Sequence, residues 1–283
     1  MAPEYLSRGK ETKEGDLSSD RGKGARASIP SVHVQNLTKT YQSRRGEIHA
    51  LEDISFTVAD QQFLTIVGPS GCGKSTILKI LAGLIPQSSG SVEVFGEPVE
   101  DSAPDVGMIF QEPVLLRWKD VTGNVLFPIE ILRRDTRKYR ARAHEILRLV
   151  GLEGFEHHSP TELSGGMQQR VAMARALVHD PRLLLMDEPF GALDQLTRQQ
   201  MNLELLRVWT ETNKTTVLIT HDIEEAVFLA DKVVVMTPRP GRVADVVDVE
   251  LPRPRELKMK MSSEFGQLVM RVGELIGLDY GRQ

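Results

Sequence analysis

Short apolar runs alternate along this chain with stretches in which apolar positions recur at helical spacing. Runs of the first kind lie at residues 62–67, 182–186 and 216–220. Such runs are typical of parallel strands that are buried on both faces. Helical spacing follows the first run at residues 77–82 and precedes the second at residues 167–178. The alternation predicts an α/β fold in which helices flank a parallel sheet.

Three other stretches extend this organisation. Residues 32–58 contain short apolar stretches on either side of a charged break, a pattern that suits antiparallel strands. Residues from about 112 to 160 change to helical spacing and are predicted to form a helical lobe inserted into the α/β unit. After a proline-containing linker at residues 251–254, one face of a closing helix is predicted from Phe265, Leu268, Val269, Val272, Leu275 and Ile276.

Composition divides the chain into three parts. Residues 1–29 are rich in Gly, Ser and charged side chains and poor in apolar ones, so we expect a disordered arm rather than a cleaved signal. Residues 30–240 are predicted to form the main folded unit, and residues 241–283 a C-terminal extension. The hydrophobic content of 40% is enough for a full core, whereas no apolar run reaches the length of a membrane span.

Net charge and cysteine content indicate which partners and which redox environment to expect. The net charge of −4 gives no electrostatic reason to expect nucleic acid as a partner. The single cysteine, Cys72, excludes an intrachain disulfide and fits a reducing cytoplasm.

A glycine-rich segment with the phosphate-loop pattern follows the apolar run at residues 62–67. Its glycines let backbone N–H groups turn toward phosphate oxygens, and the helix that follows adds the partial positive charge of its N-terminus. Lys74 would reach the β- and γ-phosphates of ATP, and the Ser75 hydroxyl would ligate Mg²⁺. The segment that is expected to bind the nucleotide comprises Gly68, Pro69, Ser70, Gly71, Cys72, Gly73, Lys74, Ser75 and Thr76.

Two carboxylates end the apolar run at residues 182–186. Because the run reads as a central parallel strand, Asp187 and Glu188 are expected at the carboxyl edge of the sheet, where ligands of open α/β sheets bind. Asp187 would then belong to the Mg²⁺ site, and Glu188 would lie closer to the attacking water. Taken alone, the pair also fits a core strand followed by an acidic helix cap. The phosphate loop upstream favours the metal site.

Residues 163–170 read Leu-Ser-Gly-Gly-Met-Gln-Gln-Arg and precede a helix. Ser164, Gly165 and Gly166 would expose a hydroxyl and backbone amides as a second anion site, although a plain helix cap explains Ser-Gly-Gly equally well. The octapeptide resembles the signature sequence of the ATP-binding cassette (ABC) ATPases. The resemblance covers roughly residues 31–240. It implies that the signature of one chain, with Gln168, binds the γ-phosphate held by the phosphate loop of a second chain.

Other positions match the motifs of this family in the same order. The resemblance implies that Tyr41 stacks on adenine and that Gln111 senses Mg²⁺ and the attacking water. It implies that Asp194 lies in a loop at the dimer interface, that His221 contacts the γ-phosphate, and that Glu188 is the general base. The fold that it implies is a P-loop NTPase (RecA-like) core with an N-terminal antiparallel β subdomain and an inserted helical lobe. Its cofactors would be ATP and Mg²⁺.

Four segments resemble the ATP-binding subunits of nitrate, sulfonate and taurine importers: residues 115–118, 121–125, 188–194 and 239–243. The resemblance implies an ATPase at the cytoplasmic face of the inner membrane. Its partners would be a second copy of the chain, a polytopic permease whose coupling helix binds after Gln111 and, indirectly, a periplasmic-type solute-binding protein. Substrate selection would belong to those other proteins.

Two features leave alternatives open. Arg117 stands where the importer pattern has proline, and Trp118 is expected either to anchor the permease or to lie in the core. A soluble ABC ATPase of the cluster-assembly type and the ATPase of an exporter also remain compatible with the motifs.

Overall fold

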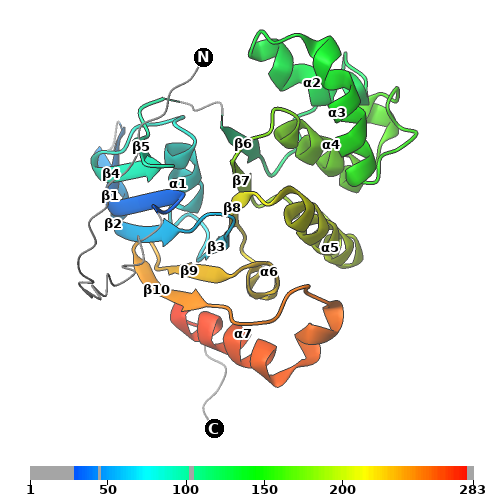
Figure 1. Ribbon diagram of the computed structural model, residues 1–283. Helices are drawn as coiled ribbons and strands as arrows, with labels where there is room; N and C mark the ends of the chain where they lie inside the picture. Colours follow the sequence, from blue (N-terminus) through cyan, green and yellow to red (C-terminus); the bar gives the residue numbers. More distant parts are fainter. Residues whose placement is uncertain (1–28, 44–45, 102–104, 279–283) are drawn as a thin grey trace, which may run out of the picture.

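The computed structural model describes residues 29–43, 46–101 and 105–278, so the expected N-terminal arm lies outside the described residues except for its last position. Two β-sheets and a helical lobe make up the molecule (Figure 1). The arrangement confirms the mixed α/β fold with an antiparallel N-terminal sheet and a parallel main sheet.

The N-terminal sheet is antiparallel and has the strand order β2-β1-β4-β5. Its apolar side chains pack together with helix α1 (Lys74–Leu81) in one buried cluster. The strand β4, between α1 and the helical lobe, was not anticipated from the sequence, because its exposed Ser-Gly-Ser start hides the two buried valines that follow. The strands are β1 (Val32–Ser43), β2 (Gly46–Val58), β4 (Ser89–Val94) and β5 (Glu97–Pro98).

The main sheet has the strand order β10-β9-β3-β8-β7-β6, in which all strands except β10 are parallel. Strands β3, β7 and β8 are built from the three apolar runs and are almost entirely buried, as parallel strands covered on both faces must be. Strand β10 pairs with β9, so the main sheet continues beyond residue 240. The strands are β3 (Phe63–Val67), β6 (Val106–Ile109), β7 (Leu183–Asp187), β8 (Thr215–Ile219), β9 (Lys232–Met236) and β10 (Val243–Asp248).

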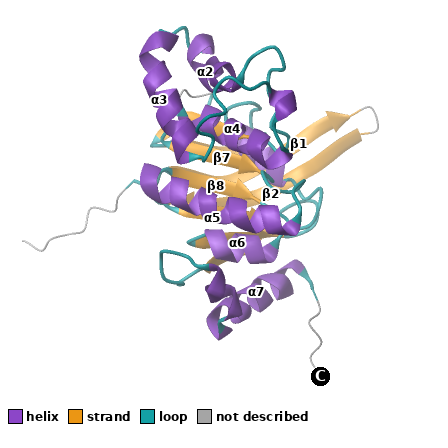
Figure 2. Ribbon diagram, turned by 90° about the vertical axis from the view of Figure 1, so that its right-hand side faces the viewer, coloured by secondary structure: helices purple, strands orange, loops and turns teal. Residues whose placement is uncertain are grey.

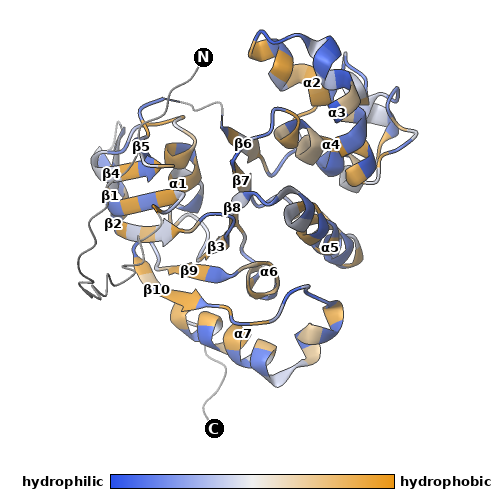
Figure 3. Ribbon diagram, in the orientation of Figure 1, coloured by the Kyte–Doolittle hydropathy of each residue, from blue (hydrophilic) through white to orange (hydrophobic). Residues whose placement is uncertain are grey.

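Helices cover both faces of the main sheet. The N-terminal sheet and α1 lie against one face (Figure 1). Helices α5 (Gln195–Thr212) and α6 (Ile223–Leu229) lie over the other (Figure 2). The predicted closing helix is α7 (Ser263–Ile276), along which apolar and polar residues alternate (Figure 3). It packs on α6 and β10 through its apolar positions, with Phe265 and Val272 fully buried.

The helical lobe is attached after β6 and returns to the sheet at β7. Helices α2 (Val121–Ile131) and α3 (Thr136–Leu149) pack against α4 (Gly165–Leu177), and all three contribute to one core. In packing terms the lobe therefore extends past residue 160 and includes α4. A short 3₁₀ turn at Pro160–Glu162 leads into α4.

Candidate functional site

The glycine-rich segment joins the buried strand β3 to α1, as its pattern predicts. Gly71 and Gly73 have φ values of +75° and +106°, which side chains rarely adopt. A Cβ on Gly73 would lie 2.6 Å from the Leu51 Cδ2 and 2.9 Å from the Ala50 carbonyl oxygen of strand β2. The N-terminal sheet therefore presses directly on the loop, and only glycine fits at this point.

Lys74 is the first residue of α1, and only 5% of it is exposed. Its ammonium donates hydrogen bonds to the carbonyl oxygens of Gly68 (2.8 Å) and Pro69 (3.1 Å), both in the same loop. The loop thus holds a buried positive charge against its own backbone. A phosphate oxygen that arrives at the loop can exchange for these neutral acceptors and form a stronger, charge-assisted bond.

The next residue connects the loop to strand β7. The Ser75 hydroxyl donates to the Asp187 carboxylate at 2.9 Å. Burial raises the pKa of Asp187, and the neighbouring charge of Glu188 adds to the rise, while the Ser75 hydrogen bond opposes it. A hydroxyl and a carboxylate side by side are oxygen ligands of the kind that Mg²⁺ takes, and Mg²⁺ usually completes its shell with water and substrate phosphates. The donor set fits that metal.

No group of three or more His, Cys, Asp and Glu side chains within the described parts of the chain could hold a metal ion by itself.

The ends of β6, β7 and β8 bring three polar side chains together. His221 Nδ1 lies 3.0 Å from the Glu188 Oε2. A Cβ placed on Gly191 would lie 3.5 Å from the Gln111 Nε2 and 3.7 Å from the same Glu188 oxygen. Glu188 has a φ of +44°, so its backbone takes a left-handed turn directly after the strand. The three residues that the sequence singled out for water positioning are therefore neighbours in space.

Tyr41 lies at the far end of β1, next to the end of the phosphate loop. Its hydroxyl is 3.4 Å from the Thr76 hydroxyl, and the Lys39 ammonium lies 5.1 Å from the centre of its ring. The side chain is partly open to solvent. A flat aromatic ring is thus available beside the loop that would hold the phosphates.

The signature residues lie at the start of α4, where Ser164 accepts a hydrogen bond from the Met167 amide at 3.3 Å. Gln168 donates to the carbonyl oxygens of Pro160 and Leu163 and so fixes the turn before the helix. Ser164 and Gly165 are exposed. Helix α4 and the phosphate-loop helix α1 lie on different sides of the main sheet (Figure 1). One chain therefore does not bring the signature to its own phosphate loop.

The signature is instead adjacent to the loop that precedes α5. A Cβ on Gly165 would lie 3.9 Å from Leu193, and one on Gly166 would lie 3.3 Å from Thr197. Asp194 caps α5 by accepting hydrogen bonds from the amides of Leu196 and Thr197. The two motifs that the family resemblance assigns to a dimer interface thus form one continuous exposed corner.

Sequence reasoning missed one contact of the phosphate loop. Arg239 donates two hydrogen bonds to the Gly71 carbonyl oxygen, at 3.1 and 2.8 Å. A Cβ on Gly241 would lie 2.1 Å from the Cys72 carbonyl oxygen, so this backbone touches the loop. The contact follows from the parallel pairing of β9 with β3, which brings the residues after both strands to one edge and is known only from the structure.

Comparison with known proteins agrees with these motifs. The model of the family described as ABC transporter matches residues 51–191. The taurine import ATP-binding protein TauB of Burkholderia thailandensis is 51% identical over 212 residues, which are 74% of this chain and 81% of that protein. An uncharacterized ABC transporter ATP-binding protein of Methanocaldococcus jannaschii is 45% identical over 225 residues, 80% of this chain and 84% of that protein. The chain belongs to the ABC transporter family.

Solved structures of ABC proteins share this fold. The ATP-binding cassette MJ0796, solved as a dimer in a post-hydrolysis state with ADP and Pi, is 33% identical and superposes with a TM-score of 0.68 over 78% of this chain and all of that one. The protein cbiO1 of Clostridium perfringens, part of the complex cbiONQ, is 26% identical with a TM-score of 0.71 over 88% of this chain and 99% of that one. The chain is thus an ATP-binding and ATP-hydrolysing ABC subunit. In the described part, no helix is long and apolar enough to cross a membrane.

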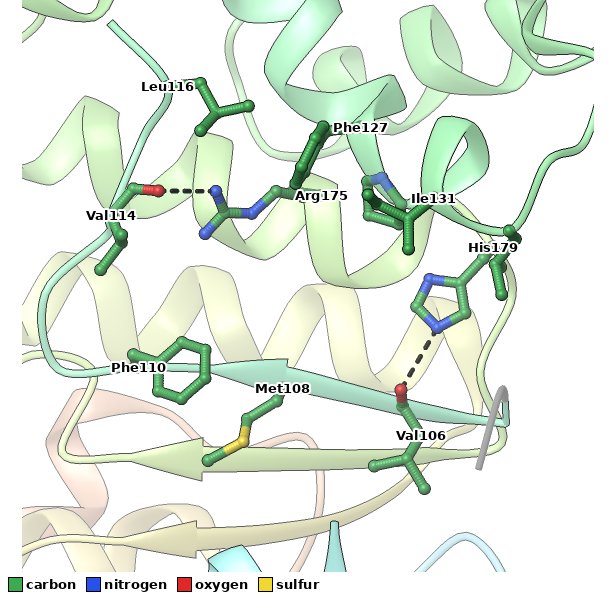
Figure 4. A pocket seen from close by; sticks show the side chains of 11 residues that line it. Val106, Met108, Phe110, Val114, Leu116, Phe127, Ile131, Arg175 and His179 are labelled. Atoms are coloured by element: carbon green, nitrogen blue, oxygen red, sulfur yellow. Dashed lines mark hydrogen bonds between the residues drawn. The ribbon is translucent and has the colours of Figure 1, made fainter. Parts of the chain in front are cut away.

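An apolar groove of about 810 Å³ opens beside the segment that follows Gln111 in this ABC subunit (Figure 4). Strand β6, the segment after it, α2 and α4 form its walls. Trp118 lies in the same segment and is 80% exposed, which excludes the core alternative for this side chain. The groove is lined by Val106, Met108, Phe110, Val114, Leu116, Phe127, Pro128, Ile131, Leu132, Arg175 and His179.

Proposed function

We propose that this chain is the ATP-hydrolysing subunit of an ABC importer for taurine, a sulfonate, nitrate or a similar small anion. The observation that carries the proposal is the similarity to proteins named taurine import ATP-binding protein, which are 46% to 51% identical over about three quarters of the chain. The importer-like segments at residues 115–118 and 239–243 support it, since Leu116 lines the apolar groove and Arg239 binds the phosphate loop.

The nucleotide would bind along the edge formed by the phosphate loop. Loop amides and Lys74 would hold the phosphates, with Lys74 exchanging its two loop carbonyls for phosphate oxygens. Tyr41 would stack on the adenine. Ser75, Asp187 and Gln111 would hold Mg²⁺, directly or through water. The ion would neutralise charge on the β- and γ-phosphates during transfer.

Glu188 would activate the attacking water, and His221 would hold the Glu188 carboxylate through the contact of 3.0 Å. Gln111 would complete the position of the water, since it flanks Gly191 together with Glu188. Such a network acts mainly by positioning, which phosphoryl transfer requires more than covalent catalysis.

A second copy of the chain would supply Ser164, Gly165, Gly166 and Gln168 to each γ-phosphate. The exposed corner that carries the signature and Asp194 supports this arrangement, and so does the dimeric state of the related cassette. Each of two equivalent sites would then be made from both chains. Nucleotide binding would close the dimer, and hydrolysis would reopen it.

The apolar groove would receive a helix of the membrane subunit. Exposed apolar patches of this kind mark interaction sites when polar residues border them. Val114 and Ile131 line the groove, and Trp118 follows its lining residue Leu116 by two positions. All three side chains are more than half exposed and would bury their apolar surface against such a helix.

Reconstitution tests the proposal. The tagged full-length chain is expressed in its own cells and purified in mild detergent with its membrane subunit, and the complex is placed in liposomes loaded with MgATP. We expect uptake of labelled taurine, an alkanesulfonate or nitrate that requires internal ATP and a solute-binding protein outside. Glu188→Gln should abolish uptake.

Two results would contradict the importer proposal. ATP-dependent efflux from the same liposomes would identify an exporter. Full ATPase activity with no membrane subunit in any purified complex would favour an ABC ATPase outside transport.

A further inference from the structure

The segment between β6 and α2 has no helix or strand of its own in residues 110–120, so its position depends on what holds its backbone. Its second half is held by α2, because the Asn124 side chain accepts from the Leu116 amide and donates to the Leu116 carbonyl. Its first half is held from another element. Arg175 of the signature helix α4 donates to the carbonyl oxygen of Pro113 at 2.6 Å and to that of Val114 at 2.9 Å. Figure 4 shows the bond to Val114.

A second side chain of α4 binds the same stretch. Gln169 is 2% exposed and donates to the Phe110 carbonyl at 3.3 Å. Gln169 and Arg175 thus hold the backbone on both sides of Gln111. The strand before the segment also contacts the helix directly, since a Cβ on Gly107 would lie 2.6 Å from the Ala176 carbonyl oxygen.

Arg175 is unusual among the arginines of this lobe because its charge is partly buried without an acidic partner. Among the described residues, no carboxylate oxygen lies within 4.0 Å of its guanidinium, whereas Arg142 and Arg170 each pair with one. Burial lowers the pKa of Arg175. A desolvated guanidinium needs its hydrogen bonds, so the two carbonyl oxygens are firmly bound partners.

The same arginine is a wall of the apolar groove, together with Val114 and Leu116. Arg175 therefore belongs to the helix that begins with the signature, lines the groove, and binds the backbone that carries Gln111. A shift of α4 would pull on residues 113 and 114 directly, and a helix seated in the groove would press on the same contacts.

We propose that Arg175 is the positioning residue that makes the segment of residues 110–116 move as one body with the signature helix. Through it, closure of the signature on a nucleotide sets the position of Gln111 and the shape of the groove. The inference rests on the proposed function, because it takes from it the roles of the signature, Gln111 and the groove.

The test compares Arg175→Met and Arg175→Lys with Arg142→Met in the full chain. Methionine keeps the unbranched apolar stem and removes all donors, whereas lysine keeps the charge and can bind one carbonyl at a time. Arg142 is the matched control, because it also donates to a backbone carbonyl next to α4, that of Val178 at 3.1 Å, but does not touch residues 110–116.

The first readout is steady-state ATP hydrolysis. Arg175→Met should lower kcat at least about tenfold, the scale expected when a catalytic group is misplaced by a fraction of an ångström. KM for ATP should stay within about twofold, because the phosphate loop is untouched. Arg175→Lys should recover part of the loss, and Arg142→Met should keep the wild-type kcat.

The second readout is hydrogen–deuterium exchange with and without MgATP, in a Glu188→Gln background that retains the nucleotide. We expect MgATP to slow exchange about tenfold in residues 110–118 when Arg175 is present. With Arg175→Met this protection should be lost, while protection at residues 164–176 remains.

Failure of the inference differs from failure of the proposed function. If Glu188→Gln hydrolyses ATP at the wild-type rate, the assigned site is wrong whatever Arg175 does. If hydrolysis depends on Glu188 but Arg175→Met retains kcat and the nucleotide-dependent protection, only the inference is overturned. A fall in kcat that comes with a higher KM for ATP and a lower melting temperature, and that lysine does not rescue, would assign Arg175 a purely structural role.

Discussion

The phosphate loop and the signature are both glycine-rich turns at the start of a helix, yet the molecule supports them differently. The loop follows a strand whose five residues are all buried, and it is braced by β2, by Asp187 and by Arg239. The signature follows a short turn and an exposed cap. The side-chain hydrogen bonds of Ser164 and Gln168 link to Met167, Pro160 and Leu163, all within eight residues.

This difference separates a preorganised half-site from an incomplete one. Residues at the loop and the ends of β7 and β8 already have their partners within the chain, so changes there should act on the chemistry of each chain by itself. Among the residues that the structure describes, the signature contacts no phosphate-binding group of its own chain. Changes there should act only through a second copy.

The largest effect is expected from Glu188→Gln, at the preorganised side. The amide keeps the size of the side chain and a hydrogen bond to His221 but cannot accept a proton, so kcat should fall by about 10² to 10⁴-fold. ATP binding should persist, and the variant should accumulate as a dimer when ATP is present. Release of radioactive phosphate measures kcat, and light scattering of the eluted complex measures dimer formation.

Glu211→Gln is the control, because Glu211 is an exposed residue in the last turn of α5, at the end of the helix away from the carboxyl ends of β7 and β8. It should hydrolyse ATP like the wild type. Wild-type turnover by Glu188→Gln would remove the general-base assignment.

A mixing experiment tests the incomplete side. Gly165→Asp should fold, because a Cβ there meets only Leu193 at 3.9 Å, but its charge would repel a γ-phosphate. Lys74→Ala should lose phosphate binding. Each variant alone should be nearly inactive, and an equal mixture should recover about a quarter of wild-type hydrolysis, since half of the dimers then hold one intact site out of two.

Recovery in the mixture is possible only if the signature of one chain serves the loop of another. Both variants should keep the wild-type circular dichroism spectrum and melting temperature. A mixture as inactive as its components would mean that each chain completes its own site.

The sequence predicted the preorganised side better than the incomplete side. The apolar runs fixed the positions of β3, β7 and β8, and because these strands are parallel, Lys74, Asp187, Glu188 and His221 had to meet at one edge. The signature could be recognised only by its resemblance to a family, since the structure shows a capped helix that local rules explain fully.

What the sequence could not give are contacts between distant backbones. Arg175 and Arg239 both bind backbone carbonyl oxygens. Because every residue has such an oxygen, the residue types do not show which one is bound. Strand β4 was missed for a similar reason, because its partner β1 lies more than fifty residues earlier. The exposure of Trp118 also needed the structure, since an aromatic residue between polar ones fits a core or a surface.

A change at Trp118 should affect neither half-site directly. Trp118→Ala should change the free energy of unfolding by less than about 0.5 kcal/mol, because the side chain is 80% exposed. If the residue anchors the membrane subunit, the affinity for that subunit should fall by about 2 kcal/mol, roughly thirtyfold in Kd. Titration of the detergent-purified membrane subunit measures it.

Met261→Ala provides the comparison for this variant, since Met261 is also an exposed apolar side chain but lies in the C-terminal extension. It should bind the membrane subunit like the wild type. Equal binding by Trp118→Ala would show that the exposed tryptophan is not an anchor.

The smallest effect on the site itself is expected from Glu225, a residue of α6 that is only 4% exposed. Burial raises the pKa of Glu225, while hydrogen bonds with Thr220 and Asn202 oppose the rise. The folded protein therefore holds this proton more tightly than the unfolded chain, whose carboxyl titrates near 4.5. Its stabilising contribution is present below that pH and is lost as the pH rises through the folded pKa.

Glu225→Gln keeps the shape and removes the titration. The difference in unfolding free energy, variant minus wild type, should therefore rise with pH above about 4.5, by at most about 1.4 kcal/mol per pH unit. Urea denaturation at a series of pH values between 4.5 and 7.5 measures it, with the exposed neighbour Glu224→Gln as control. A difference that stays flat across this range would mean that the buried carboxyl does not hold its proton.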